Sequence, residues 1–275
     1  MENIKVDTNE LKKLYKNIGF MNPAGGKYKE RICKNSQVND YLTQIISAIK
    51  KLSTKKEIVL LDCACGRSYL SFVVYYYCQE ILKRKIRIIG VDKNADLILK
   101  CRKIACELDF KNVRFYCNDI MELKLDMTPD IVYCLHACDT ATDMTIAKGI
   151  RENAKYIITV SCCQHTTMKQ IRQHPLTCIT RFKPYKERIV EMISDSMRAL
   201  LLEQQGYSVD IFEFTSTRNT AKNIMVRAIK GNRNLIKEEK SKCEYIKLQN
   251  SFHIRPAAEK FLDNEKTLEL YAAME

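Results

Sequence analysis

Residues 58–68 read IVLLDCACGRS, in which aliphatic side chains lead into Asp62 and then into a turn of small residues around Gly66. Aliphatic and β-branched residues favour a buried strand, and a glycine among small residues favours a tight turn. Residues 69–78, which follow, are nearly all apolar. A strand, a turn and an apolar helix in this order are typical of the first unit of a parallel α/β sheet.

The same alternation of strand and helix patterns continues along the chain. Strands are predicted at Ile58–Asp62, Ile86–Asp92, Val113–Asn118, Asp130–Leu135, Tyr156–Ser161, Tyr207–Phe214 and Asn223–Lys230. Helices between them are predicted at Ser68–Lys83, Ala95–Asp109, Thr142–Glu152 and Tyr185–Gln205. Only residues 215–222 separate the last two strands, which predicts an antiparallel hairpin. We therefore expect a Rossmann-like α/β fold of the class I methyltransferase type. Its seven-stranded sheet is mostly parallel, with helices on both faces and a C-terminal antiparallel hairpin.

A chain of 275 residues with 46% hydrophobic content can bury one α/β core and modest extensions. We assign the core, the methyltransferase domain, to residues 57–230 and a basic N-terminal helical extension to residues 1–56, with a helix at Gln37–Lys50. Residues 231–275 form a C-terminal helical extension, in which Pro256–Met274 is the predicted helix.

The longest apolar run is half a membrane span, and the N-terminus lacks the apolar stretch of a signal peptide. Thirteen cysteines, an odd number with many in strand patterns, indicate reduced thiols. We expect a cytoplasmic protein that does not bind membranes.

The net charge is +13, and residues 1–56 carry +7 of it. Such an arm favours a polyanionic partner, with solubility alone as the alternative.

Three predicted strands end at or next to an aspartate, namely Asp62, Asp92 and Asp119. Because ligands of open α/β sheets bind at the carboxyl ends of the strands, these aspartates predict a cofactor site. The single glycine of the first turn argues against NAD, whose pyrophosphate needs close backbone approach, and favours S-adenosylmethionine. Asp92 is placed to accept the ribose hydroxyls, and Asp119 to meet the adenine amino group. Each aspartate alone is compatible with a helix cap. The predicted cofactor residues are Asp62, Ala64, Cys65, Gly66, Asp92, Lys93, Asn118, Asp119, Leu135 and His136.

Two later strand ends, residues 135–143 (LHACDTATD) and 160–165 (VSCCQH), are expected to face the transferred methyl group. The motif Asn/Asp-Pro-Pro-Tyr, which holds amino acceptors in many base N-methyltransferases, is absent. The absence of this motif therefore favours a hydroxyl group as the methyl acceptor. A hydroxyl acceptor can need a base that removes its proton. The candidates are His136, Asp139, Asp143 and His165. Their alternatives are a hydrogen-bonded core histidine, helix caps and helix-dipole complementarity.

Cys162 and Cys163 admit three interpretations: small buried residues, thiolates that attack a pyrimidine, or metal ligands together with His136, Cys138 or His165. Burial is the default, and Cys163 is kept among the catalytic candidates. No metal is predicted, because there is neither a spaced Cys-x-x-Cys pair nor a second cluster.

The stretch between His165 and Arg188 is rich in cations, with Phe182 and Tyr185 interleaved. Such a segment can follow a nucleic-acid backbone and stack a base, or it can be a solvated insertion. The loop at residues 217–223 borders the same edge of the expected sheet, with a simple hairpin turn as its alternative. The candidate substrate-binding residues are Lys169, Arg172, Arg181, Lys183, Lys222 and Asn223.

Three segments together resemble one methyltransferase superfamily: Asp62-x-x-x-Gly66, residues 135–143 and residues 162–165 (CCQH). This superfamily includes the eukaryotic tRNA acceptor-stem 2′-O-methyltransferases, with their K-H-L-C-G-x-A-T-D segment. The sequence is more similar to uncharacterised bacterial members that read L-H-A-C-D-T-A-T-D, then C-C-Q-H, then T-P-K-N. The resemblance covers roughly residues 27–230.

The resemblance implies S-adenosylmethionine binding and the class I fold, and it suggests methylation of an RNA 2′-hydroxyl. Leu135 stands where the tRNA enzymes have lysine, and Asp139 where they have glycine. Their zinc-binding N-terminal modules have no counterpart, and Ala221 replaces the proline of the bacterial pattern. These departures leave tRNA specificity open.

We therefore expect an S-adenosylmethionine-dependent methyltransferase that acts on RNA (tRNA or rRNA), with the ribose 2′-hydroxyl favoured and no obligate protein partner. The alternatives are an enzyme of the same fold that acts on a small molecule or protein, and a non-catalytic RNA-binding protein that binds S-adenosylmethionine.

Overall fold

The computed structural model describes residues 14–19, 29–171 and 173–262. Its strands form one seven-stranded sheet with the order β3-β2-β1-β4-β5-β7-β6. This order confirms the predicted seven-stranded, mostly parallel sheet with an antiparallel C-terminal pair. The strands are β1 (Ile58–Cys63), β2 (Ile86–Asp92), β3 (Val113–Cys117), β4 (Ile131–Ala137), β5 (Tyr156–Ser161), β6 (Tyr207–Glu213) and β7 (Ile224–Lys230).

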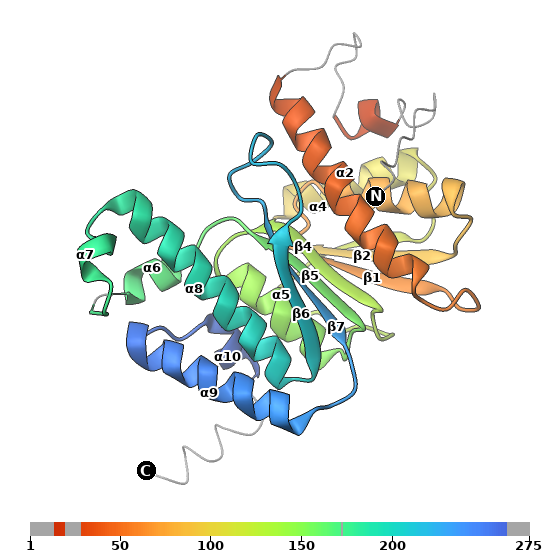
Figure 1. Cartoon of the computed structure of the whole chain (residues 1–275). Helices are drawn as coiled ribbons and strands as arrows, with labels where there is room; N and C mark the ends of the chain where they lie inside the picture. The colour runs from red at the N-terminus through yellow and green to blue at the C-terminus, as the bar shows by residue number, and fades with distance from the viewer. Residues whose placement is uncertain (1–13, 20–28, 172, 263–275) are drawn as a thin grey trace. The chain divides into compact units, whose positions relative to one another are not determined.

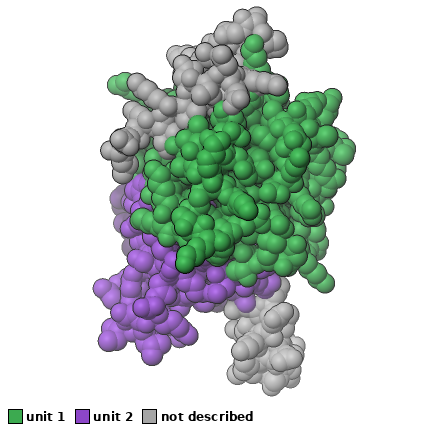
Figure 2. All heavy atoms as spheres, turned by 90° about the vertical axis from the view of Figure 1, so that its right-hand side faces the viewer, with its two compact units in different colours: residues 1–130, 213–224 green, residues 131–212, 225–275 purple. Residues whose placement is uncertain are grey.

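The chain forms two compact units, drawn in different colours in Figure 2. Unit 1 consists of residues 1–130 and 213–224, and unit 2 of residues 131–212 and 225–275. The division into residues 1–56, 57–230 and 231–275 stays a prediction. Each unit is described by itself below.

In unit 1, β1 pairs in parallel with β2, and β2 pairs in parallel with β3. Both faces of β1 are buried, as expected for a strand inside a parallel sheet. Helix α4 packs on β2 and β3, and α2 packs on α3. The helical segments of this unit are α2 (Lys29–Lys50), α3 (Tyr69–Tyr76), the π-helix η1 (Tyr77–Ile81) and α4 (Ala95–Glu107).

The helix predicted at residues 68–83 is interrupted in the structure. It is α-helical only to Tyr76 and then continues as the π-helix η1, in which the Leu82 N–H donates to the Tyr77 carbonyl at 3.0 Å. This hydrogen bond spans five residues instead of four, so one extra residue is accommodated in the turn. Apolar periodicity does not reveal such an insertion.

In unit 2, β4 pairs in parallel with β5, and β5 pairs antiparallel with β7. Helix α5 packs on both β4 and β5. Helices α8 and α9 run side by side, as Figure 1 shows in teal and blue, and α10 packs on α5. The helices of this unit are α5 (Thr140–Arg151), α6 (His165–Gln170), α7 (Thr177–Thr180), α8 (Lys183–Gln204), α9 (Leu235–Phe252) and α10 (Ala257–Leu262).

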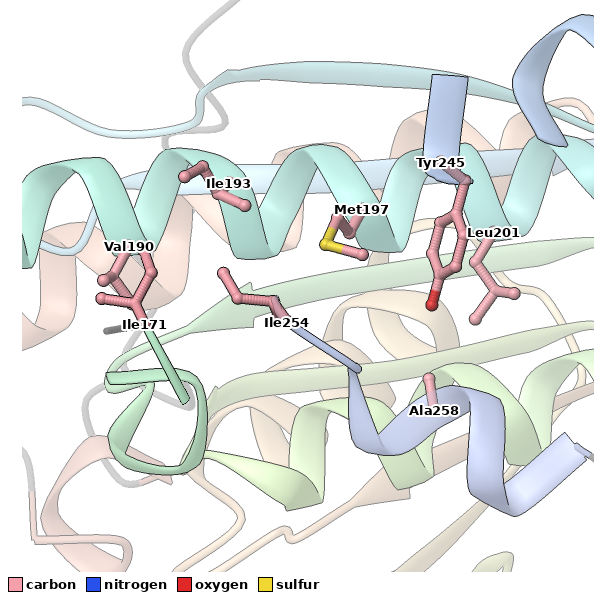
Figure 3. Packing of buried hydrophobic residues seen from close by; sticks show 8 residues of the cluster. All are labelled: Ile171, Val190, Ile193, Met197, Leu201, Tyr245, Ile254 and Ala258. Atoms are coloured by element: carbon pink, nitrogen blue, oxygen red, sulfur yellow. The ribbon is translucent and has the colours of Figure 1, made fainter. Parts of the chain in front are cut away.

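Residues 231–249, which are charged and weakly periodic, contain most of a long helix, α9. Its Tyr245 is buried in an apolar cluster with α8, whereas Leu235 and Ile236 at its start are exposed. Figure 3 shows how the side chains of this cluster point toward one another; its buried members are Ile171, Val190, Ile193, Met197, Leu201, Tyr245, Ile254 and Ala258. Tyr245, Ile254 and Ala258, which follow the last strand, are therefore part of the core of unit 2. The predicted helix at residues 256–274 is α10 as far as Leu262, and the remainder lies outside the described residues.

Among the helices that the structure describes, none combines the length and the apolar character needed to cross a lipid bilayer.

Gly90 on β2 gives a direct test of the packing in unit 1. A Cβ atom there would lie 2.5 Å from Cδ1 of Phe115, a buried ring of β3. We expect Gly90→Ala to lower the free energy of unfolding by about 1–3 kcal/mol, because overpacking a tight core forces the neighbouring ring to move. The measurement is urea unfolding followed by circular dichroism.

Gly231→Ala is the matched control, since its Cβ would meet the nearest atom only at 3.8 Å. Its stability should change by no more than about 0.5 kcal/mol. Equal effects of the two substitutions would contradict the packing described for β2 and β3.

Candidate active site

The turn after β1 has an unusual backbone. Ala64, Gly66 and Ser68 all have positive φ angles, of 52°, 54° and 52°. Non-glycine residues rarely adopt this conformation, and such strain gathers at functional sites. A Cβ atom added to Gly66 would meet nothing within 4 Å, so the turn borders open space. The backbone at Gly66 is therefore accessible to a ligand.

The carboxylate of Asp92, at the end of β2, is tied to this turn. Its Oδ2 accepts the backbone N–H of Gly66 at 2.8 Å, and its Oδ1 accepts the N–H of Asn94 at 2.9 Å. Each carboxylate oxygen has capacity for a further hydrogen bond. Asp92 can therefore hold the turn in place and still accept hydroxyl groups of a bound ribose.

The end of β3 carries the third acidic position. Asp119 accepts the N–H of Met121 at 2.7 Å and pairs with the Lys93 ammonium at 2.7 Å. The side-chain oxygen of Asn118 accepts the N–H of Asp119 at 2.8 Å. The structure thus brings Asn118, Asp119 and Lys93 together, and Lys93 serves here as a partner of Asp119.

Asp62 differs from the other two strand-end acids because it is buried. Its Oδ2 accepts the hydroxyls of Ser71 at 2.5 Å and Ser68 at 3.1 Å. Burial raises the pKa of Asp62 to about 7, although these hydroxyls lower it. In this arrangement Asp62 connects the end of β1 to the start of α3. Neighbouring Cys65 donates its backbone N–H to the Val91 carbonyl at 3.0 Å.

In unit 2, His136 occupies a β-bulge near the end of β4. Leu135 pairs with Val160 and Ala137 with Ser161, so His136 is an extra residue without a register partner on β5. Its φ is 58°, and its side chain is half-buried. Bulges change the direction of a side chain and are common beside active sites. His165 begins α6 and is exposed.

Asp139 links the two segments that follow β4 and β5. Its carboxylate accepts the backbone N–H of Thr166 at 3.0 and 3.1 Å and the Thr166 hydroxyl at 2.5 Å. Its own N–H donates to the Cys163 carbonyl at 3.2 Å, and its φ of 50° is positive. In the structure, Asp139 thus stabilises the start of α6.

Asp143 forms a buried ion pair with Arg198 of α8, with 2.9 Å between Oδ1 and Nε. Arg198 also pairs with Asp195 at 3.0 Å, and Asp195 accepts the Ser161 hydroxyl at 3.1 Å. Burial alone lowers the pKa of Arg198, but the two carboxylates outweigh it, so its pKa is raised and the guanidinium stays charged. The sequence reasoning missed Arg198 and Asp195, because a charged residue on an amphipathic helix resembles a solvent-exposed one.

The thiols of Cys138, Cys162 and Cys163 converge, with sulfurs 3.0 Å apart for Cys138 and Cys162 and 3.9 Å for Cys162 and Cys163. Burial, and then the neighbouring Cys138 thiol, raise the pKa of Cys162 and of Cys163. Both shifts favour the neutral thiol over the thiolate at Cys162 and Cys163. A catalytic role of Cys163 stays a prediction.

The candidate substrate residues lie in several places. Lys169 on α6, Arg181 and Lys183 are exposed, whereas Arg172 lies outside the described residues. Lys222 is half-buried. Asn223 is buried, and its side chain donates to the Thr215 carbonyl at 3.0 Å within the loop between β6 and β7.

Fold and strand ends together define a class I methyltransferase. Residues 33–170 match the family model Methyltransf_32, described as a methyltransferase domain. This match covers half of the 275-residue chain, so the chain belongs to that family. It is a methyltransferase that uses S-adenosylmethionine. No curated protein matches the chain.

Solved structures with a similar fold include magnesium protoporphyrin IX methyltransferase from Synechocystis with bound SAH. It is 15% identical, has a TM-score of 0.49, and the match covers 81% of this chain and 95% of that one. An rRNA methylase from Streptococcus thermophilus is 9% identical with a TM-score of 0.44, and 69% of this chain and 95% of that one are covered. Both likenesses concern the fold alone.

Arg198 gives a test of the ion-pair network. In Arg198→Met the carboxylates of Asp143 and Asp195 lose their buried counter-charge, which is expected to cost about 3–5 kcal/mol of unfolding free energy. Chemical denaturation measures the loss. The control is Lys240→Met, which removes an exposed pair with Glu244 whose side chains are 73% and 47% exposed. That change should cost no more than about 0.5 kcal/mol. Similar losses in the two variants would show that Arg198 is not the central counter-ion.

Proposed function

We propose that the protein methylates RNA, with a ribose 2′-hydroxyl as the favoured acceptor. The observation that carries the proposal is a basic and aromatic surface on unit 2, residues 181–186 at the start of α8. In this surface two large aromatic side chains are exposed among cations. A resemblance to RNA 2′-O-methyltransferases, at residues 135–143 and 162–165, supports the same substrate class.

The rings of Phe182 and Tyr185 are 48% and 53% exposed. They pack edge to face, 6.2 Å between centroids, and the Arg181 guanidinium lies 4.7 Å from the Phe182 centroid. Lys183 is exposed beside them. Exposed rings stack on unpaired bases and neighbouring cations contact phosphates, so this surface suits single-stranded or looped RNA.

Unit 1 supplies residues that suit S-adenosylmethionine. Asp92 would hold the ribose hydroxyls, and Asn118 and Asp119 would hold the adenine. The accessible backbone at Gly66 would contact the methionine moiety. When bound, the cofactor supplies an electrophilic methyl group: the acceptor oxygen gains the methyl carbon, the sulfur keeps the electron pair, and the hydroxyl proton needs a base.

We propose His136 or His165 as that base, because an imidazole has a suitable intrinsic pKa near neutrality. His136 is redirected by the bulge of β4, and His165 is exposed at the start of α6. Asp139 and Asp143 have hydrogen-bonding and ion-pair partners, so we assign them to positioning. Leu135, next to the bulge, completes the proposed cofactor residues.

An enzyme of this fold that acts on a small molecule or protein is the main alternative. A non-catalytic RNA-binding protein that binds S-adenosylmethionine is a second one. Both can be separated from the proposal by following where a labelled methyl group goes.

We expect the full chain to transfer labelled methyl groups from S-adenosylmethionine to the RNA fraction of total cellular material, and nucleoside analysis to find 2′-O-methylated ribose. Transfer only to protein or small molecules would contradict the RNA proposal. Binding of RNA without any transfer would favour the non-catalytic alternative.

The double variant Arg181→Ala/Lys183→Ala should bind RNA more weakly, with a salt dependence reduced by about 1–2 in slope, because fewer phosphates are contacted. The control Lys240→Ala/Lys247→Ala removes two exposed lysines of α9 and equal charge. The two double variants can be compared by filter binding across salt concentrations. Equal effects would mean that net charge, not the basic and aromatic surface, determines binding.

A further inference from the structure

Three of the thiols of unit 2, those of Cys138, Cys162 and Cys163, form a cluster that the proposed function does not use. Their sulfur atoms all lie within 4.8 Å of one another. Among the residues that the structure describes, this is the one group of three or more histidine, cysteine, aspartate or glutamate side chains close enough to hold a metal ion. Cys138 comes from the segment after β4, and Cys162 and Cys163 come from the segment after β5.

Packing in the core does not account for this cluster. Cys63, Cys78 and Cys134 are core cysteines, and each is 0% exposed. In contrast, Cys138 is exposed, and Cys162 and Cys163 are half-buried. A disulfide would use two of the sulfurs and leave the third without a role. Convergence of all three at an accessible place instead fits thiolate coordination of a metal.

The Cys162 thiol donates to the His136 carbonyl at 3.4 Å, and further contacts that do not involve the sulfurs arrange the backbone around the cluster. The bulge at His136 and the positive φ of Asp139 flank Cys138 on either side. The Asp139 N–H donates to the Cys163 carbonyl, and its carboxylate binds Thr166. These contacts bring together cysteines 24 residues apart in sequence. A site built on such supports is preorganised for its ligand.

We propose that Cys138, Cys162 and Cys163 bind a zinc ion through their thiolates. With Zn–S bonds of about 2.3 Å, tetrahedral geometry places sulfurs about 3.8 Å apart. The 3.9 Å between Cys162 and Cys163 matches this spacing, and the 3.0 Å between Cys138 and Cys162 requires only a small opening. Thiolate ligands select a small set of metals that includes zinc.

Three protein ligands leave the fourth position of the zinc open, as in catalytic rather than structural zinc sites. The ion would also clamp together the two segments that carry His136 and His165. The zinc site does not depend on RNA being the substrate. Neither the three cysteines nor the contacts of Asp139 that position them involve residues 181–186.

The test is metal analysis and titration of the full chain, prepared under reducing conditions and without an affinity tag. We expect about one zinc per chain, and we expect Co²⁺ added after chelation to produce a thiolate-to-cobalt charge-transfer band. Loss of a supporting residue around a metal costs about 10- to 100-fold in affinity. Cys162→Ser and Cys163→Ser, which remove a ligand, should each lose at least about 100-fold, while circular dichroism confirms folding.

Cys178→Ser is the matched control, since Cys178 is an exposed cysteine of the same unit outside the cluster. It should bind zinc as the unaltered chain does. Failure of the reduced chain to bind zinc or cobalt would overturn the proposal, as would undiminished binding by both cluster variants. A disulfide between Cys138 and Cys162 that an added oxidant forms in the presence of saturating zinc, seen by mass spectrometry, would also overturn it.

Discussion

The proposed cofactor site of unit 1 depends on two hydrogen bonds that the Asp92 carboxylate accepts. One oxygen holds Gly66 and the other holds Asn94, so a single side chain fixes the turn after β1 and the turn after β2. The turn after β1 has left-handed backbone at Ala64 and Ser68, which is unfavourable for non-glycine residues unless other contacts hold it. We propose that the same carboxylate accepts the ribose hydroxyls of the cofactor. Turn stability and the proposed ligand recognition then depend on one residue.

In unit 2, buried charged side chains hold the segments that follow the strands. Arg198 of α8 neutralises Asp143 of α5 and Asp195, while Asp139 connects the segment after β4 to α6. Such pairs contribute little net stability compared with apolar packing, but losing one partner is costly. Their effect is therefore to define where the segments after β4 and β5 lie. Those segments carry the histidines proposed as bases and the thiols proposed as zinc ligands.

The sequence predicted the sheet well because strands buried on both faces are continuous apolar runs, as in β1 and β5. It also placed Asp92 and Asp119 at adjacent strand ends. It could not reveal the π-helical turn at Tyr77–Ile81 or the bulge at His136, since one extra residue leaves the local pattern unchanged. Helix α9 was obscure because its buried residues are Glu238, Ser241 and Tyr245, so the buried face shows little apolar periodicity.

The other features that the sequence did not predict are contacts between residues far apart along the chain. Arg198 meets Asp143 across 55 positions, and Cys138 meets Cys162 across 24, with no spacing rule to connect them. Only a spatial arrangement distinguishes a buried arginine from an exposed one, or a cysteine cluster from scattered core thiols. The proposed cofactor residues are therefore easier to identify from sequence than the residues proposed to position the acceptor.

The most direct measurement is calorimetric titration of the protein with S-adenosylmethionine and its demethylated product. The account predicts saturable binding by the unaltered chain, loss of binding in Asp92→Ala, and retained binding in Asp96→Ala, which removes an exposed acid four residues further along the chain. No binding by the unaltered chain, or equal binding by Asp92→Ala, would contradict it.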